Sequence, residues 1–133
     1  MPDRMDPEQA AGNSDKAFEI GARLFDEQRF WEAHEFFEYV WKCDDVGPAD
    51  RDFWRGVTQV AVGFCHAQRG NAPGAVTLLN RATRNLDGYP SPHLRVHTRR
   101  LRGLAVRVSD EIQARGNAHV RGFPRFPIVV PSS

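Results

Sequence analysis

The sequence has few of the features that define several large classes of proteins. Only two of its 133 residues are cysteines, too few for the disulfide framework of a small secreted domain. Its best candidate for an apolar span, residues 56–68, is too short and too polar for the roughly 20 apolar residues of a membrane helix. The N-terminal residues 1–4 are not followed by an apolar run, so no signal peptide is expected. These absences favour a cytoplasmic protein with reduced thiols and no membrane partner.

Lysine is absent from the second half of the chain, where the basic residues are arginines. Residues 1–66 hold 14 acidic and 7 basic side chains, whereas residues 67–133 hold 3 acidic and 11 basic ones. Attraction between the halves, or a solvated charged face, explains this separation, and an anionic partner is the alternative. Arg95, Arg99 and Arg102 have the spacing of one helix face, but the basic half lacks a glycine-rich phosphate loop. We therefore do not expect a nucleic-acid partner.

The composition and length indicate a single globular domain. The hydrophobic fraction is 41% and the charged fraction 26%, which is ordinary for a soluble chain of this size. Residues 1–13 are polar and aperiodic, and we expect a disordered leader there. Residues 14–116 carry helical periodicity and form the expected domain. Residues 117–133 contain three prolines, so we expect an extended tail that packs on the helices.

The hydrophobic spacing predicts an all-α bundle of about five helices, with no strand before the tail. Gly70 has the backbone freedom to end one of these helices, and Asn71 is a typical cap for the next. Two antiparallel helical hairpins, similar to tetratricopeptide hairpins, are followed by a long basic helix. The expected helices cover about residues 15–27, 30–42, 50–69, 71–86 and 93–115.

The second expected helix carries the main candidate residues. Placed at 100° steps from Phe30, His34 and Glu38 fall between Trp41 and Trp31, inside the aromatic stripe. A buried carboxylate is costly unless it is paired, protonated or bound to a cation. The spacing therefore predicts an imidazole and a carboxylate, one turn apart, that are withdrawn from water.

The third expected helix offers further polar side chains. Arg55, Gln59 and His66 lie on one side of it, flanked by Gly56 and Gly63, which would permit close approach by another helix. Because the connection between the second and third helices is short, we expect these two helices to be neighbours. The predicted cluster is His34, Glu38, Gln59 and His66, with Glu35 at its rim.

One interpretation of this cluster is a divalent metal site. His34, Glu38 and His66 would bind zinc, manganese or iron. Glu35 would act as the base that activates a bound water, as in the His-Glu-x-x-His proteases, although Glu38 replaces the second histidine of that motif. Metal-assisted hydrolysis is the reaction class if the protein is an enzyme, which the sequence leaves open.

Two other interpretations need no metal. The same residues would form a buried polar network that fixes the register of the helices, or a pocket for a small polar ligand. Trp31, Trp41, Gln59 and Arg55 would line such a pocket. The protein would then be a non-catalytic binding module, whose hairpin groove receives a ligand, a protein partner or a second copy in a homo-oligomer.

The motifs also resemble a known family. Residues 34–41 fit the pattern His-x-x-x-Glu-x-x-Trp, and a second block follows within residues 56–79. Together they resemble the domain of unknown function 309 family over about residues 18–86. The resemblance implies a small all-helical fold and a suspected role of the His-x-x-x-Glu-x-x-Trp residues in metal binding, but no established reaction. The residues that carry it are Phe30-Trp31-Glu32-Ala33, His34, Glu38, Trp41, Gly56, Gln59, Ala61, His66, Gly70-Asn71, Gly74-Ala75 and Leu78-Leu79.

Overall fold

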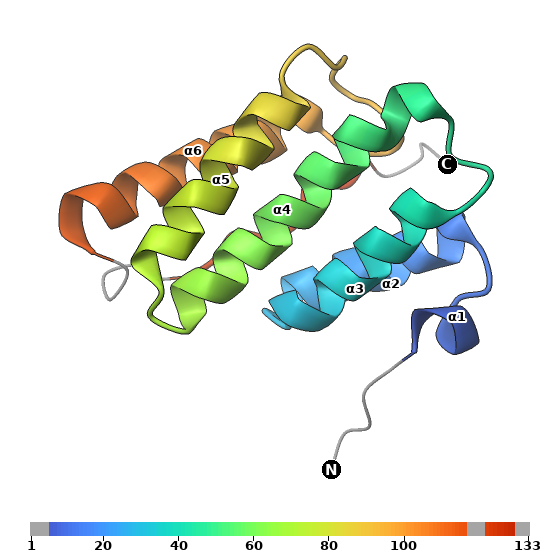
Figure 1. The fold of residues 1–133 in the computed structure, drawn as a ribbon, viewed down its shortest axis with the longest axis horizontal. Helices are drawn as coiled ribbons and strands as arrows, with labels where there is room; N and C mark the ends of the chain where they lie inside the picture. Colours follow the sequence, from blue (N-terminus) through green and yellow to red (C-terminus); the bar gives the residue numbers. More distant parts are fainter. Residues whose placement is uncertain (1–5, 117–121, 130–133) are drawn as a thin grey trace.

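Helices make up the regular structure of this chain in the computed structural model, which describes residues 6–116 and 122–129 (Figure 1). No strand occurs in those ranges, where the only β-type pairings are isolated bridges from Val96 to His93 and to Ile128. The all-α prediction is therefore confirmed. The elements are α1 (Pro7–Ala10), α2 (Ser14–Asp26), α3 (Phe30–Lys42), the 3-10 helix η1 (Pro48–Asp50), α4 (Arg51–Gln68), α5 (Ala72–Leu86) and α6 (Thr98–Arg115).

The long helices from α2 to α6 pack mainly on their neighbours in the sequence. α2 pairs with α3 and α4 pairs with α5, as two hairpins that meet where α3 lies beside α4, and α6 then packs on α5 (Figure 1). The connections from α2 to α5 are short, so these consecutive helices run antiparallel, as in other helical hairpins, whereas residues 87–97 form a longer link to α6. This arrangement places one long face of α3 against α4.

Two ends of the helical region differ from the prediction. The short helix α1 lies where a disordered leader was expected, with the Asp6 side chain accepting a hydrogen bond from the Glu8 backbone N–H at 2.9 Å. The last helix starts at Thr98 rather than near residue 93. Leu94 and Arg95 have φ of 47° and 70°, values that a helix does not accommodate. Leu94 itself is 43% exposed.

Described residues of the tail complete the hydrophobic core. The Phe126 side chain is 4% exposed, and its ring centroid lies 5.3 Å from that of Phe25 and 5.7 Å from that of Phe18. Phe123 packs in the same way on Phe30, at 5.1 Å. Residues 122–129 therefore cover the phenylalanines of the first hairpin.

The glycines of α4 allow α5 to approach closely. A Cβ atom added at Gly56 would lie 2.9 Å from Cγ of Leu86, and one at Gly63 would lie 2.7 Å from Cδ2 of Leu79. Both leucines belong to α5. The close helix contact predicted from these glycines exists, but the partner is α5 and not α3.

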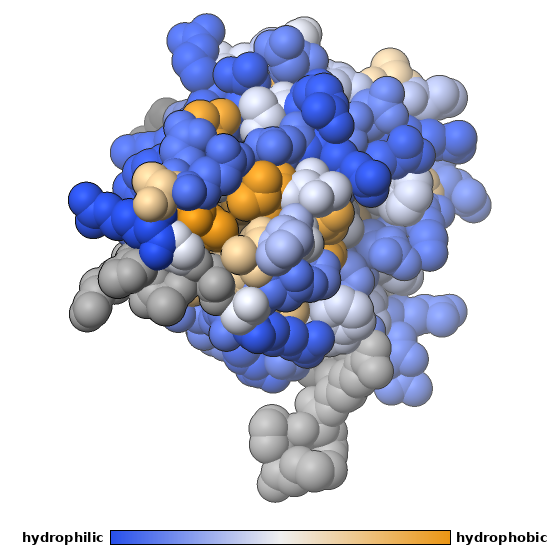
Figure 2. Space-filling model, turned by 60° about the vertical axis from the view of Figure 1, so that its left-hand side comes forward, coloured by the Kyte–Doolittle hydropathy of each residue, from blue (hydrophilic) through white to orange (hydrophobic). Residues whose placement is uncertain are grey.

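The surface offers few large apolar side chains. In the face drawn in Figure 2, hydrophilic side chains surround a small hydrophobic area. Among the described residues, the large hydrophobic side chains classed as exposed are Trp31, Leu94 and Val106. None of the helices in the described ranges is long and apolar enough to cross a bilayer.

Candidate functional site

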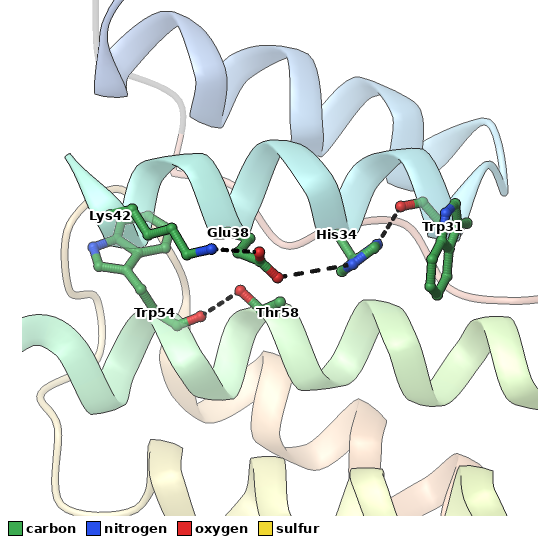
Figure 3. A network of polar contacts seen from close by, with 6 residues as sticks. All are labelled: Trp31, His34, Glu38, Lys42, Trp54 and Thr58. Carbon is green, nitrogen blue, oxygen red and sulfur yellow. Dashed lines mark hydrogen bonds and ion pairs between the residues drawn. The ribbon is translucent and has the colours of Figure 1, made fainter. Parts of the chain in front are cut away.

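The motif residues of α3 form a line along its contact with α4 (Figure 3). Trp31, His34, Glu38 and Lys42 recur every three or four residues, which places them on one side of a helix. We define the α3–α4 row as these four residues, Trp41, and the two arginines that stack on the tryptophans, Arg55 in α4 and Arg69 at its C-terminal cap. The two helices pack against each other.

His34 is held in place by its own helix. Its Nδ1 lies within hydrogen-bond distance of the backbone carbonyl oxygen of Trp31, and since a carbonyl only accepts, Nδ1 carries the proton. The imidazole also packs on the Trp31 indole, with ring centroids 4.3 Å apart. The other nitrogen, Nε2, lies 3.9 Å from Oε2 of Glu38, and the His34 side chain is 13% exposed.

Glu38 is not withdrawn from water, which corrects the sequence prediction. Its side chain is 40% exposed, and its Oε1 accepts a hydrogen bond from Nζ of Lys42 at 2.8 Å. The middle of the aromatic stripe, between the two tryptophans, is not the middle of the buried face. The buried residues of α3 centre about 60° before Phe30, so Glu38 lies roughly 140° from the middle of the buried face. They are Phe30, Ala33, Phe36, Phe37 and Val40.

The exposure of Glu38 leads to a prediction about stability. We expect Glu38→Gln to lower the free energy of unfolding by no more than about 0.5 kcal/mol, the value of an exposed ion pair one helical turn apart. Urea denaturation measures the change. A loss above about 1.5 kcal/mol would contradict the solvent-facing position and would indicate that the carboxylate is buried.

Each tryptophan of the row stacks with an arginine, one within α4 and one at its C-terminal cap. The guanidinium carbon of Arg55 lies 5.2 Å from the ring centroid of Trp41, and that of Arg69 lies 5.4 Å from the ring centroid of Trp31. The two indoles are nearly three turns apart on α3, or about 15 Å. They therefore mark the two ends of the row. They do not line one small pocket, whereas the sequence had indicated such a pocket for Trp31, Trp41 and Arg55.

His66 and Gln59 contact a different helix. Nδ1 of His66 lies 3.2 Å from Nδ2 of Asn71, which in turn caps α5, and Oε1 of Gln59 accepts a hydrogen bond from Nδ2 of Asn85 on α5 at 2.7 Å. The predicted cluster is thus divided between the two sides of α4. The cause is the Gly56 and Gly63 flank, which turns this side of α4 toward α5.

The described residues do not support the metal interpretation. In residues 6–116 and 122–129, no three histidine, cysteine, aspartate or glutamate side chains are grouped so that they could hold an ion. His34 and Glu38 remain one turn apart on α3, but His66 contacts the cap of α5 instead. The role proposed for Glu35, as a base beside a metal-bound water, loses the ligand set on which it depended.

Sequence reasoning missed two members of the row, Lys42 and Arg69. Lys42 follows Glu38 by one helical turn, a spacing that indicates an ion pair and was available in the sequence. The stacking of Arg69 on Trp31 joins residues from two helices, and only the pairing of α3 with α4 reveals it.

The thiol of Cys65 lies in the core, and this leads to a second prediction. Burial raises the pKa of the Cys65 thiol above its usual value, although the Arg69 charge opposes the change. Since the thiolate is the reactive form, we expect native Cys65 to react with a disulfide reagent at pH 8 at least tenfold more slowly than in the urea-unfolded protein. Mass spectrometry of the modified peptides gives both rates, and equal rates would contradict the buried position.

These observations define a small all-α protein, built from helical hairpins, that displays a row of stacked aromatic and charged side chains between its second and third long helices. The model of the family described as "Domain of unknown function (DUF309)" matches residues 18–78 of the chain. The match confirms the resemblance found in the sequence. It extends from α2 into α5 and so includes both helices of the α3–α4 row.

The other two comparisons gave no match. Neither the curated proteins nor the solved structures include one that matches the chain. The family match supplies no reaction, ligand or partner.

Proposed function

We propose that this protein is a cytosolic, non-catalytic binding module whose α3–α4 row receives a short acidic segment of a partner protein. The observation that carries the proposal is the exposure of Trp31, whose side chain is 42% exposed although it is one of the largest apolar groups in the chain. Leaving an indole in water contributes little to folding. Tryptophan and arginine are also the residue types that most often dominate binding energy at protein interfaces.

The stacking of the row gives the tryptophans a defined position before any partner arrives. Arg69 covers part of the Trp31 ring from one side, and His34 packs on it. His34 is itself fixed by its hydrogen bond to the Trp31 carbonyl oxygen. Side chains that are ordered in advance lose less conformational entropy on binding, which favours affinity.

The charges of the row favour an acidic partner. Lys42, Arg55 and Arg69 are cationic, and the Glu38 carboxylate already accepts a hydrogen bond from Lys42. Arg55 forms an ion pair with Asp52 that is 3.7 Å long and more than half solvent-exposed on the Asp52 side, so this pair contributes little. Both ends of the row therefore present a guanidinium group to which a carboxylate can bind.

The length of the row sets the length of the segment. Arg55 and the α4 cap residue Arg69 are about four turns apart, or about 21 Å along the axis of α4. An extended peptide advances about 3.3 Å per residue, so two acidic side chains six residues apart would reach both arginines. The backbone between them would lie over His34 and Glu38.

A peptide titration tests the proposal. The probe is a heptapeptide with aspartate at both ends and alternating serine and alanine between them, and its control carries lysine at both ends. We expect NMR shifts at the row with the acidic peptide, and an affinity at least fivefold weaker for Trp31→Ala and for Arg69→Ala. Arg99→Ala, an exposed arginine on α6, is the matched control and should leave the affinity unchanged.

Two results would overturn the proposal. One is equal binding of the acidic and the basic peptide, which would remove the charge argument. The other is a dimer in solution that Trp31→Ala converts to a monomer, which would make a second copy of the chain the occupant of the row.

A further inference from the structure

A second candidate site lies at the end of the bundle where α3 leads into α4, away from the Trp31 end of the α3–α4 row. The start of α2, the end of α3, η1 with the start of α4, and the loop before α6 surround a hollow of about 330 Å³ there. That volume falls within the range of small-molecule sites. The hollow is lined by Ser14, Asp15, Phe18, Val40, Asp45, Val46, Asp50, Trp54, Leu94 and Arg95.

The inner part of the hollow is apolar. Phe18, Val40 and Trp54 line it and are otherwise buried, with 3%, 1% and 5% of their surface exposed. The rings of Phe18 and Trp54 meet edge to face, with centroids 5.5 Å apart. Such a surface favours a flat or aliphatic ligand body, because contact with the rings removes apolar area from water.

The rim of the hollow carries three carboxylates: Asp15, Asp45 and Asp50. Oδ2 of Asp45 accepts a hydrogen bond from the Ser14 hydroxyl at 2.5 Å, which orients the carboxylate but leaves its charge in place. Asp50 pairs with Nε2 of His93 at 2.8 Å. Asp15 is exposed at the first turn of α2.

The one arginine that lines the hollow is paired with a carboxylate outside it and stacks on Phe18. The Nη1 atom of Arg95 lies 3.2 Å from Oε1 of Glu19, a residue outside the hollow, and its guanidinium carbon lies 5.3 Å from the ring centroid of Phe18. Its backbone carbonyl accepts a hydrogen bond from the Val129 N–H at 2.7 Å, which fixes this wall to the tail. Since Glu19 offsets the Arg95 charge, the carboxylates determine the sign of the hollow.

We propose that this hollow binds an organic cation: an ammonium group on an apolar body about the size of an indole. The ammonium group is held by Asp45 and Asp15 at the rim, and the body rests on Phe18 and Trp54. Nothing in the proposed function uses these side chains, so the two sites are tested separately.

Three probes with the same body distinguish the charge requirement. Tryptamine carries an ammonium group, indole-3-acetate carries a carboxylate, and tryptophan carries both. We expect calorimetric titration to show that tryptamine binds with at least tenfold higher affinity than indole-3-acetate. Tryptophan tests the Arg95 Nε atom, which is buried without a hydrogen-bond partner among the described residues. We expect tryptophan to bind no better than tryptamine, because its carboxylate meets the acidic rim.

A pair of neighbouring variants locates the site. Asp45→Asn keeps the shape of the side chain and removes its charge, and we expect it to weaken tryptamine binding about tenfold. Asp44→Asn is the matched control, an exposed carboxylate that does not line this hollow, and should change nothing. Asp15→Asn supplies a second variant if Asp45→Asn reduces folding, and Trp31→Ala should leave tryptamine binding intact.

Three outcomes would overturn the inference. They are the absence of tryptamine binding at millimolar concentration, tighter binding of indole-3-acetate or tryptophan, and equal effects of Asp44→Asn and Asp45→Asn. None of them affects the heptapeptide test, which depends on the α3–α4 row.

Discussion

Phe126→Ala is expected to lower the free energy of unfolding by about 3–5 kcal/mol, the usual cost of removing a buried phenylalanine. The Phe126 ring contacts Phe25 and Phe18, and its centroid lies 5.3 Å from that of Phe37. Its backbone N–H also donates to Oδ1 of Asp26 at 2.6 Å. Denaturation in urea, followed by circular dichroism, measures the loss.

The neighbouring residue supplies the control for this tail prediction. The Arg125 side chain is 84% exposed, and its Nε lies 3.9 Å from Oδ2 of Asp26, so Arg125→Ala should cost less than about 0.5 kcal/mol. If Phe126→Ala stayed within 1 kcal/mol of the wild type, the tail would not form part of the core.

Gly63→Ala is expected to destabilise the protein by about 1–2 kcal/mol. The added methyl group would lie 2.7 Å from Cδ2 and 2.8 Å from Cγ of Leu79, and overpacking of this kind costs about 1–3 kcal/mol. The better helix propensity of alanine offsets up to about 1 kcal/mol of that cost. Thermal denaturation should therefore show a lower midpoint.

A second glycine provides a control for which we expect alanine to increase stability. A Cβ added at Gly103 in α6 would have nothing within 4 Å, so Gly103→Ala should stabilise the protein by up to about 1 kcal/mol. If both alanine variants were stabilised alike, α4 and α5 would be further apart than the structure places them.

The helices were predictable where their boundaries are local. Asn71 accepts a hydrogen bond from the Gly74 N–H at 3.0 Å, and α5 begins at the next residue, as the cap had indicated. The start of α6 depends on distant contacts instead. Val96 forms a bridge with Ile128, and the His97 N–H donates to the Pro127 carbonyl oxygen. A hydrophobic pattern within residues 93–115 contains no information about the tail.

The candidate site was predictable only in part. The wheel correctly placed His34 and Glu38 on one side of α3, one turn apart, and their side chains lie 3.9 Å from each other. It could not tell that Trp31 lies outside the buried face and Trp41 only at its margin, because an aromatic residue fits the same pattern whether the core or an arginine side chain covers it. The partner of each α4 side chain depends on which helix packs on which flank.

The uneven charge of the two halves has a structural counterpart. Among the described residues, Arg95 pairs with Glu19 and Arg125 with Asp26, and each pair joins an arginine of the second half to an acidic residue of the first. Nε2 of His93 also lies 2.8 Å from Oδ1 of Asp50. Arg95 lies outside α6, so it does not share a helix face with Arg99 and Arg102. Attraction between the halves accounts for part of the separation without a nucleic-acid partner.

The indole N–H resonances of the three tryptophans test the proposed function most directly. During titration with the acidic heptapeptide, the signals of Trp31 and Trp41 should move, while that of Trp54, which is 5% exposed, should remain in place. Substitution of each tryptophan by phenylalanine assigns the signals. Stationary Trp31 and Trp41 signals, or a Trp54 signal that moves with them, would contradict recognition at the α3–α4 row.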